Sequence, residues 1–350
     1  MKLNEICEVY SGYALKSFND AEDGLPVVKI GNILTDGTLN LDECQYTTDS
    51  VNEKYYSNKG DIYIALSGAT TGKIGIMDAD ERYVVNQRVG IVRKKSDDVP
   101  QEYIKYFLLR QTDRILQEAA GCAQPNISPK QIAEYSVPEI TKEKMFEVCG
   151  VLDKTKRIID MRKAELTALD DLIKARFVEM FGTPYVNEKG FPMLTVDDVI
   201  EFTGGAQPDK KYFEYEPTED NIRLIQIRDY KTDNYITYIP KSMAKRFCEA
   251  DDIMIGRYGP PIFQILKGIE GSYNVALMKA TPKIGNKEFI RYFLKQECLF
   301  NYLDGLSQRT AGQSGIEMPA LKAYPFPYPP IELQEQFEQF ANQVDKSKVG

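Results

Sequence analysis

The stretch TKEKMFEVCGVLDKTKRIIDMRKAELTALDDLIKARFVEMF (141–181) constrains the fold more strongly than any other part of the sequence. It contains no proline, and its only glycine is Gly150. Apolar residues recur every seven positions, at Met145, Leu152, Ile159, Leu166, Ile173 and Met180. This heptad repeat predicts one long helix, roughly 60 Å in length, that pairs with another helix along an apolar seam. Gly182, Thr183 and Pro184 predict where the helix ends.

The end of the sequence resembles the first part of this helix. QVDKSK (343–348) is similar to VLDKTK (151–156), and Phe337, Phe340 and Val344 continue the same apolar seam. We therefore expect a short second helix over 331–350, truncated relative to the first and antiparallel to it. Such a helix would cover only the region near Ile173 and Met180. Leu152 and Ile159 would face solvent unless another chain covers them, because exposed aliphatic surface is unfavourable.

The segments on either side of the long helix are similar to each other, which indicates an internal duplication. Five pairs recur in the same order: EVYSGYA (8–14) and IEFTGGA (200–206), VVKIGN (27–32) and LIQIRD (224–229), GDIYIALSG (60–68) and DDIMIGRYG (251–259), EYIKYFLL (102–109) and EFIRYFLK (288–295), and AQPNISPKQIAEYSVP (123–138) and GQSGIEMPALKAYPFP (312–327). Any one pair is weak evidence. Five pairs in one order predict two diverged copies of one domain.

Each copy has the pattern of a mixed α/β unit. VVKI, GDIYIAL and RVGIVRK are rich in β-branched residues and predict strands. Residues 100–121 predict one helix, with Ile104, Phe107, Leu108 and Ile115 on its buried face. The expected class is α+β: two similar mixed α/β domains at 1–140 and 184–330, joined by a long coiled-coil-type helix at 141–183, with a short second helix at 331–350.

Composition excludes several kinds of function. The chain has no histidine, which removes the Ser-His-Asp triad and histidine-based zinc hydrolases. Its six cysteines are scattered without a CxxC pair, so we expect neither a metal site nor a disulfide framework. It has no apparent leader and no long apolar run, so we expect a cytoplasmic protein. The net charge of −8 counts against a free-standing nucleic-acid binder, unless contacts are local or shared with basic partners.

Several loops nevertheless carry side chains suited to DNA. SGATTGKIG (67–75) is one residue short of a nucleotide P-loop, so it is either a tight connector or a DNA contact. NQRVGIVRKK (86–95) offers amides and an arginine that can pair with bases, followed by Arg93, Lys94 and Lys95 for phosphates, although a strand with a solvated basic end fits equally well. The candidate DNA-binding residues are Ser67, Thr70, Thr71, Lys73, Asn86, Gln87, Arg88, Gln124 and Asn126 in the first copy, and Arg257, Tyr258, Tyr273, Asn274, Arg309, Gln313 and Ser314 in the second.

The order of domain, long helix, domain and helix resembles the specificity subunit of type I restriction-modification systems. The segments that carry this resemblance are GATTGKIGI and VVNQRVGIVR within 68–93, AQPNIS (123–128), LIKARFVEMFG (172–182) and FPYPPIELQEQ (326–336). The first copy departs from the family at VPEITKEKMFEV, where a Pro-Pro-x-x-x-Gln pattern is usual. The resemblance covers essentially the whole chain.

The resemblance implies a non-catalytic, DNA-binding subunit used in phage defence. Each target-recognition domain would read one half of a bipartite sequence in double-stranded DNA, and the helices would act as a spacer. Two adenine-N6 methyltransferase subunits, which bind S-adenosylmethionine, would dock on it, and restriction subunits could join them. The chain itself would hold no cofactor or metal, and could self-associate through the truncated helix. Two alternatives are a self-contained DNA methyltransferase or nuclease, and a protein-interaction scaffold that does not bind DNA.

Overall fold

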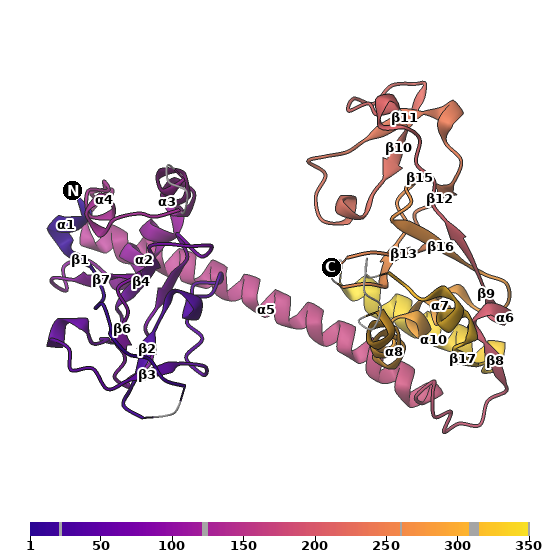
Figure 1. Ribbon diagram of the computed structural model, residues 1–350, viewed down its shortest axis with the longest axis horizontal. Coiled ribbons are helices and arrows are strands. Elements are labelled where there is room, and N and C mark those ends of the chain that lie inside the picture. The colour runs from indigo at the N-terminus through magenta and orange to yellow at the C-terminus, as the bar shows by residue number, and fades with distance from the viewer. Residues whose placement is uncertain (21–22, 121–124, 260, 308–314, 349–350) are drawn as a thin grey trace. The chain divides into compact units, whose positions relative to one another are not determined.

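The computed structural model describes residues 1–350 except 21–22, 121–124, 260, 308–314 and 349–350 (Figure 1). The chain divides into two compact units, Met1–Met161 and Arg162–Gly350. The division falls inside α5 (Lys142–Phe181), an unbroken helix of 40 residues. The long helix predicted from the heptad repeat is therefore confirmed. It ends at Gly182, whose positive φ of 72° and N–H bond to the Val178 carbonyl form a helix C-cap.

Unit 1 is built on two sheets. The larger has the order β1-β7-β4-β5, and the smaller has the order β3-β2-β6. Their bounds are β1 (Cys7–Ser11), β2 (Leu25–Val28), β3 (Gln45–Thr47), β4 (Ile62–Ala65), β5 (Ile74–Ile76), β6 (Val84–Val85) and β7 (Val89–Lys94). The helices before α5 are α1 (Leu3–Ile6), α2 (Gln101–Arg110), α3 (Thr112–Ala119) and α4 (Pro129–Ala133), with 3-10 turns η1 (Ile30–Asn32) and η2 (Glu53–Tyr55). Every residue of β4 is buried, so this strand lies at the centre of the core.

The helix predicted over 100–121 is divided into α2 and α3, which corrects the expectation of one continuous helix. The break is at Gln111, whose N–H bonds to the Leu108 carbonyl three residues back instead of four. The Thr112 hydroxyl donates to the Leu109 carbonyl and competes with the regular helix bonds. The four predicted core residues of this segment are all buried.

Unit 2 repeats this plan with additions. It has two four-stranded sheets, with the orders β14-β13-β16-β9 and β11-β10-β15-β12, and β8 pairs with β17. The bounds are β8 (Met193–Thr195), β9 (Ile200–Gly204), β10 (Asn221–Ile225), β11 (Tyr238–Pro240), β12 (Phe247–Cys248), β13 (Ile253–Gly256), β14 (Gln264–Lys267), β15 (Gly271–Tyr273), β16 (Leu277–Pro282) and β17 (Pro325–Pro327). The helices are α6 (Val196–Val199), α7 (Lys287–Leu294), α8 (Glu297–Ser307), α9 (Met318–Ala323) and α10 (Ile331–Ser347), with 3-10 turns η3 (Lys210–Tyr212), η4 (Ile227–Tyr230) and η5 (Lys241–Met243).

The two units share one topology, as the repeated segments predicted. The order β1-β7-β4-β5 corresponds to β9-β16-β13-β14, and the parallel pair β2–β6 corresponds to β10–β15. The structure corrects the sequence alignment of the first repeated pair, EVYSGYA and IEFTGGA, by one residue. Gly12 corresponds to Gly205, and not to Gly204 as that alignment predicted. Each glycine bonds to the first residue of the neighbouring strand, and a Cβ at either would lie within 2.2 Å of a carbonyl oxygen.

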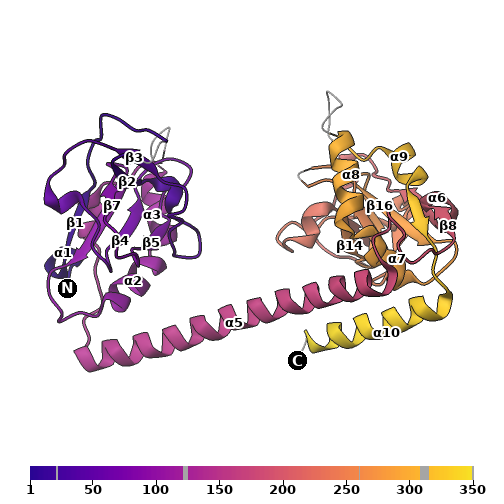
Figure 2. The same ribbon diagram turned by 90° about the horizontal axis from the view of Figure 1, so that it is seen from below.

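The C-terminal half of α5 packs against α10 inside unit 2 (Figure 2). Phe177 meets Phe337 with ring centroids 5.3 Å apart, and Arg162 donates to the Lys348 carbonyl at 2.8 Å. Since residue numbers rise along one helix as they fall along the other, the two helices are antiparallel. The mixed α+β class with one long and one short C-terminal helix is confirmed.

The predicted helix-pairing residues occupy three different environments. Met145 is buried in the unit 1 core, and Ile173, Phe337 and Val344 are buried in the unit 2 core. Leu166, Met180 and Phe340 are partly buried. Leu152 and Ile159 are 37% and 46% exposed, and every residue from 151 to 160 faces solvent.

The fully buried seam in unit 2 differs from the predicted heptad line. It runs through Ile173, Phe177 and Phe181, which are spaced by four residues, while Met180 lies at its edge. Residues four apart remain on one face of a helix over two turns, so aromatic side chains at this spacing can fill the core together. Within the described part of the chain, no helix has the length and apolar character needed to cross a membrane.

Candidate nucleic-acid interface

A groove of about 520 Å³ in unit 1 brings together four of the predicted contact residues, Ser67, Gln87, Arg88 and Asn126. They come from three separate segments: the end of β4, the turn before β7, and the loop before α4. A backbone bridge between Ser67 and Asn126 joins two of these segments. We call this feature the unit 1 groove; its full lining is Ser11, Leu66, Ser67, Gln87, Arg88, Pro125, Asn126, Ile127, Ser128 and Pro129.

The turn that carries Gln87 and Arg88 is held by Asn86. The Asn86 carboxamide oxygen accepts from the Arg88 N–H at 3.2 Å, and the Val89 N–H donates to the Asn86 carbonyl at 2.9 Å. Asn86 is only 9% exposed, whereas Gln87 and Arg88 are exposed. The structure therefore places Asn86 beneath the turn, and the two residues after it face outward.

The loop over 67–73 has a similar division of roles. The Thr71 hydroxyl donates to the Gly68 carbonyl at 2.7 Å, and Thr71 is buried. The Thr70 hydroxyl oxygen is also buried. Gly68 and Gly72 both have positive φ, which tightens the loop. Thr71 thus holds the loop in place, whereas the buried Thr70 hydroxyl has no hydrogen-bond partner among the described residues, and Lys73 is partly exposed beside them.

Arg93, Lys94 and Lys95, which were expected to contact phosphates, lie at the end of β7 and already bind other groups of unit 1. Arg93 makes two hydrogen bonds to buried Asp61, at 2.8 and 2.6 Å, and these bonds raise the pKa of its guanidinium. Lys94 pairs with Asp97, and Lys95 donates to the Asn4 carbonyl. The expectation that Arg93 contacts a phosphate is therefore corrected. Its guanidinium already binds the Asp61 carboxylate with two hydrogen bonds, and Asp61 is distant in sequence but adjacent to Arg93 in the folded sheet.

Arg88 is in a different situation. Among the described residues, no hydrogen bond or ion pair engages its guanidinium, and none of the ten residues that line the unit 1 groove is acidic. Gln87 and Asn126 are exposed beside it, and no described residue bonds to their side-chain amides. Within the described part of the chain, the groove thus presents an unpaired cation together with unpaired amide donors and acceptors, which is the chemistry that reads base edges.

Unit 2 places Asn274 and Tyr258 at positions that match Asn86 and Ser67 of unit 1. Asn274 has the role of Asn86: its side-chain oxygen accepts from the Ala276 N–H at 3.1 Å, and the residue is buried. Tyr258 is bridged to Gly315, as Ser67 is to Asn126. Tyr273 belongs to the core, with its hydroxyl donating to the Thr203 carbonyl.

Two further residues of unit 2 are accessible at this position. The Arg257 guanidinium lies 5.2 Å from the Tyr258 ring and donates to the Val275 carbonyl at 3.4 Å. Val275 is 47% exposed. The predicted contacts Gln124, Arg309, Gln313 and Ser314 lie outside the described residues.

Sequence reasoning missed Ser11, Ser128 and Val275. Ser11 and Ser128 line the unit 1 groove, and Ser128 caps α4 through a bond from the Gln131 N–H. Ser128 could have been found from its position directly before Pro129, since serine before proline is a helix-start pattern. Val275 has no local signal of its own; only the alignment of Asn274 with Asn86 identifies it as the counterpart of Gln87.

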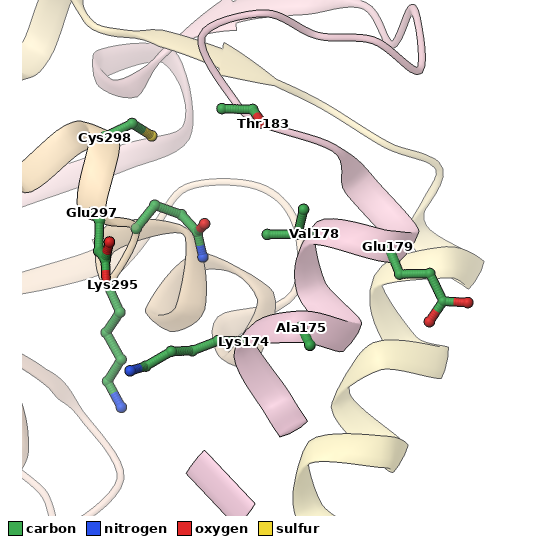
Figure 3. Close-up of a pocket in the computed structure, with 9 residues that line it drawn as sticks. Lys174, Ala175, Val178, Glu179, Thr183, Lys295, Glu297 and Cys298 are labelled. Carbon is green, nitrogen blue, oxygen red and sulfur yellow. The ribbon is translucent and has the colours of Figure 1, made fainter. Parts of the chain in front are cut away.

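A larger cavity of about 690 Å³ lies in unit 2, between the end of α5 and the segment from Lys295 to Cys298 (Figure 3). Its labelled side chains include two lysines, two glutamates and Cys298. It contains none of the predicted contact residues. The unit 1 groove is therefore the feature that the sequence and the structure both indicate.

Comparisons with known proteins match this organisation. Residues 1–168 match the model of the type I restriction modification DNA specificity domain. The MjaVIII specificity subunit of Methanocaldococcus jannaschii is 25% identical over 174 residues, which cover 47% of this chain and 41% of that protein. The chain thus spans less than half the length of that relative. The EcoBI specificity subunit of Escherichia coli is 20% identical over 397 aligned positions, covering 99% of this chain and 80% of that protein.

The fold is also similar to a solved structure. The S subunit from M. genitalium aligns over all of this chain and 89% of its own, with a TM-score of 0.54 and 15% identity. A structure from a study of complex assembly in a type I system aligns with a TM-score of 0.50 and 16% identity, over all of this chain and 90% of that one. The resemblance that the sequence indicated is therefore confirmed.

Proposed function

We propose that this chain, which resembles type I restriction-modification specificity subunits throughout, reads a bipartite sequence in double-stranded DNA and positions adenine-N6 methyltransferase subunits on it. The observation that carries the proposal is the unit 1 groove. It lies within the part of the chain that matches the DNA specificity domain, and its described residues present an unpaired arginine and unpaired amides with no carboxylate among them. These groups can pair with base edges in the major groove.

The duplication supports a target in two halves. Both units have the same sheet order and the same asparagine-supported turn, so each would present a reading surface at the same place in its fold. The residues that follow the asparagine differ: they are Gln87 and Arg88, both exposed, in unit 1, and exposed Val275 and partly exposed Ala276 in unit 2. Different side chains at one structural position favour two half-sites of different sequence.

The division of labour follows the family. We propose target-recognition domains over 1–140 and 184–330, and helical segments over 141–183 and 331–350. Two methyltransferase subunits would supply S-adenosylmethionine and catalysis, restriction subunits could join them, and the chain itself would not be catalytic. The net charge of −8 is compatible with this function if basic partners provide much of the phosphate contact.

The exposed part of α5 supports a docked partner. Val151, Leu152, Ile158, Ile159 and Met161 are all between 37% and 67% exposed. Aliphatic side chains grouped on one helical segment in this way are typical of a protein interface. We therefore propose that a methyltransferase subunit, or a second copy of this chain, covers this segment in the assembled complex.

Methylation sequencing tests the function directly. The full chain is co-expressed with its methyltransferase subunits, and methyladenine is located in the host DNA by single-molecule sequencing. We expect a split motif with two defined halves, absent when either protein is omitted. A palindrome built from one half would indicate pairing of two copies instead.

Two results would favour the alternatives. Methyl transfer or cleavage by the isolated chain would identify a self-contained enzyme. An assembled complex that binds no DNA would identify a scaffold. Binding measured with and without the partners over a range of salt concentrations tests their share of the phosphate contacts, because each released counterion steepens the salt dependence.

A further inference from the structure

Each unit has one arginine at the same pair of backbone positions, but on opposite strands. In unit 1 the Leu66 N–H donates to the Arg88 carbonyl at 2.9 Å, and in unit 2 the Arg257 N–H donates to the Ala276 carbonyl at 2.9 Å. Leu66 therefore corresponds to Arg257, and Arg88 corresponds to Ala276. Arg88 directly precedes β7 in unit 1, whereas Arg257 directly follows the central strand β13 in unit 2.

Among the described residues, no acidic group neutralises either arginine. No described carboxylate forms an ion pair with Arg88 or Arg257, whereas Arg93 pairs with Asp61 and Arg223 pairs with Asp233. Arg257 makes one long bond to the Val275 carbonyl, which leaves most of its five donors free. An arginine without a counter-ion on an acidic protein is poised for an external acceptor.

The surroundings favour a base over a phosphate. Arg88 lies in the unit 1 groove among uncharged amides and hydroxyls, and Arg257 lies beside the Tyr258 ring and the exposed Val275 side chain. Lysines are sparse in these surroundings, since Lys73 is only partly exposed and Lys94 and Lys95 are engaged elsewhere. A planar guanidinium in such a setting is suited to the O6 and N7 acceptors of guanine, which it binds with two bonds at once.

We propose that Arg88 and Arg257 are the guanine-reading residues of the two half-sites, one in each unit. This inference rests on the proposed function. It requires that each half of the recognised sequence contains at least one guanine that is read in the major groove. It also implies that the duplicated domain exchanged the strand that supplies its arginine while keeping the position of the reading surface.

The test uses the full chain assembled with its methyltransferase subunits. In binding assays with the motif found by sequencing, each guanine is replaced in turn by 7-deazaguanine, which lacks the N7 acceptor. We expect one guanine in each half-site at which this replacement weakens binding by about 2- to 12-fold, the range for the loss of one of the two hydrogen bonds, since the O6 acceptor is kept. In the Arg88→Ala variant, 7-deazaguanine should no longer weaken binding at one of these guanines but should still weaken it at the other. In the Arg257→Ala variant, the two guanines should exchange these behaviours.

Matched variants separate base reading from other roles. Arg88→Lys keeps a charge for a phosphate but loses the planar fork, so we expect it to behave like Arg88→Ala at the guanine. Arg110→Ala and Arg246→Ala remove exposed arginines of units 1 and 2, and should leave the methylation motif unchanged. In Arg88→Ala the motif should become degenerate at one position of one half only.

Three results would overturn the proposal. One is a half-site in the wild-type complex at which no guanine responds to 7-deazaguanine, and this needs no variant to fold. Another is an equal loss of affinity for all sequences in Arg88→Ala, which would indicate a phosphate contact. The third is an unchanged motif in both alanine variants. A wild-type complex that methylates without sequence preference would instead refute the proposed function.

Discussion

Replacing Phe337 by alanine tests whether α10 closes the core of unit 2. Phe337 is completely buried, and its ring meets those of Phe177, Phe181 and Tyr292 at centroid distances of 5.3, 5.6 and 5.3 Å. All three contacts are edge-to-face, the favoured geometry for aromatic pairs. The side chain therefore joins α10 to α5 and to α7 at one point.

The expected cost can be worked out from this environment. Truncation of a buried phenylalanine typically costs about 3–5 kcal/mol, and each aromatic pair adds roughly 0.5–1.5 kcal/mol beyond the buried area. Three such pairs place Phe337→Ala at the upper end, about 5 kcal/mol. At roughly 2–4 °C per kcal/mol for a unit of this size, the melting temperature of unit 2 should fall by about 10–20 °C.

A local reporter is needed because two units need not unfold together. The chain has no tryptophan, so Tyr302→Trp introduces a single tryptophan in α8, where the ring centroids of Tyr302 and Tyr324 lie 5.2 Å apart. Urea unfolding is then compared for Phe337→Ala and Phe340→Ala in this background. Phe340 is partly buried and faces Arg176 at 5.7 Å, so its loss should cost only about 1 kcal/mol. Equal losses in the two variants would refute the packing argument.

The remaining predictions concern three other features. Gly12→Ala should destabilise unit 1 by about 1–3 kcal/mol, since its Cβ would lie 2.2 Å from a carbonyl oxygen. Gly150→Ala should stabilise α5 by about 0.5–1 kcal/mol, because the space around Gly150 is open and alanine favours the helix. Free energies of unfolding in urea that change with the opposite signs would contradict this. Burial raises the pKa of the Asp229 carboxyl, so the native state holds its proton to higher pH than the unfolded chain, and unit 2 should lose stability as pH rises through that raised pKa. Asp229→Asn should flatten this pH dependence of unfolding, and an unaltered slope would refute it. Leu152→Ser with Ile159→Ser should change the stability of the isolated chain by less than about 0.5 kcal/mol but reduce co-purification with the methyltransferase subunit; undiminished co-purification would exclude this segment as the docking surface.

Much of the fold could be predicted because its signals are local or repeated. The long helix was evident from the spacing of Met145 to Met180, since a seven-residue period is a property of the helix itself. The duplication was evident because five segments recur in order, and the shared sheet order confirms it. The break at Gln111 was not evident, since it depends on one hydroxyl that competes with the helix bonds.

The candidate site was only partly visible in the sequence. The residue types in NQRVGIVRKK indicate base and phosphate chemistry, and this much follows from composition. Which of them are accessible depends on their partners: Asn86 supports the turn, Arg93 is bound to Asp61, and Arg88 is left free in the groove. No local pattern could have separated these roles.

The sequence by itself determined the helical period, the two copies and the kinds of side chain available to contact DNA. Only the tertiary structure decided which arginine has an acidic partner and which has none among the described residues. It also showed that Arg88 and Arg257 occupy the two opposite positions of one backbone hydrogen-bonded pair that both units share. The physical reason is distance along the chain. A helix or a strand follows from neighbouring residues, whereas the pairing of a charge depends on residues that come together only when the sheet forms.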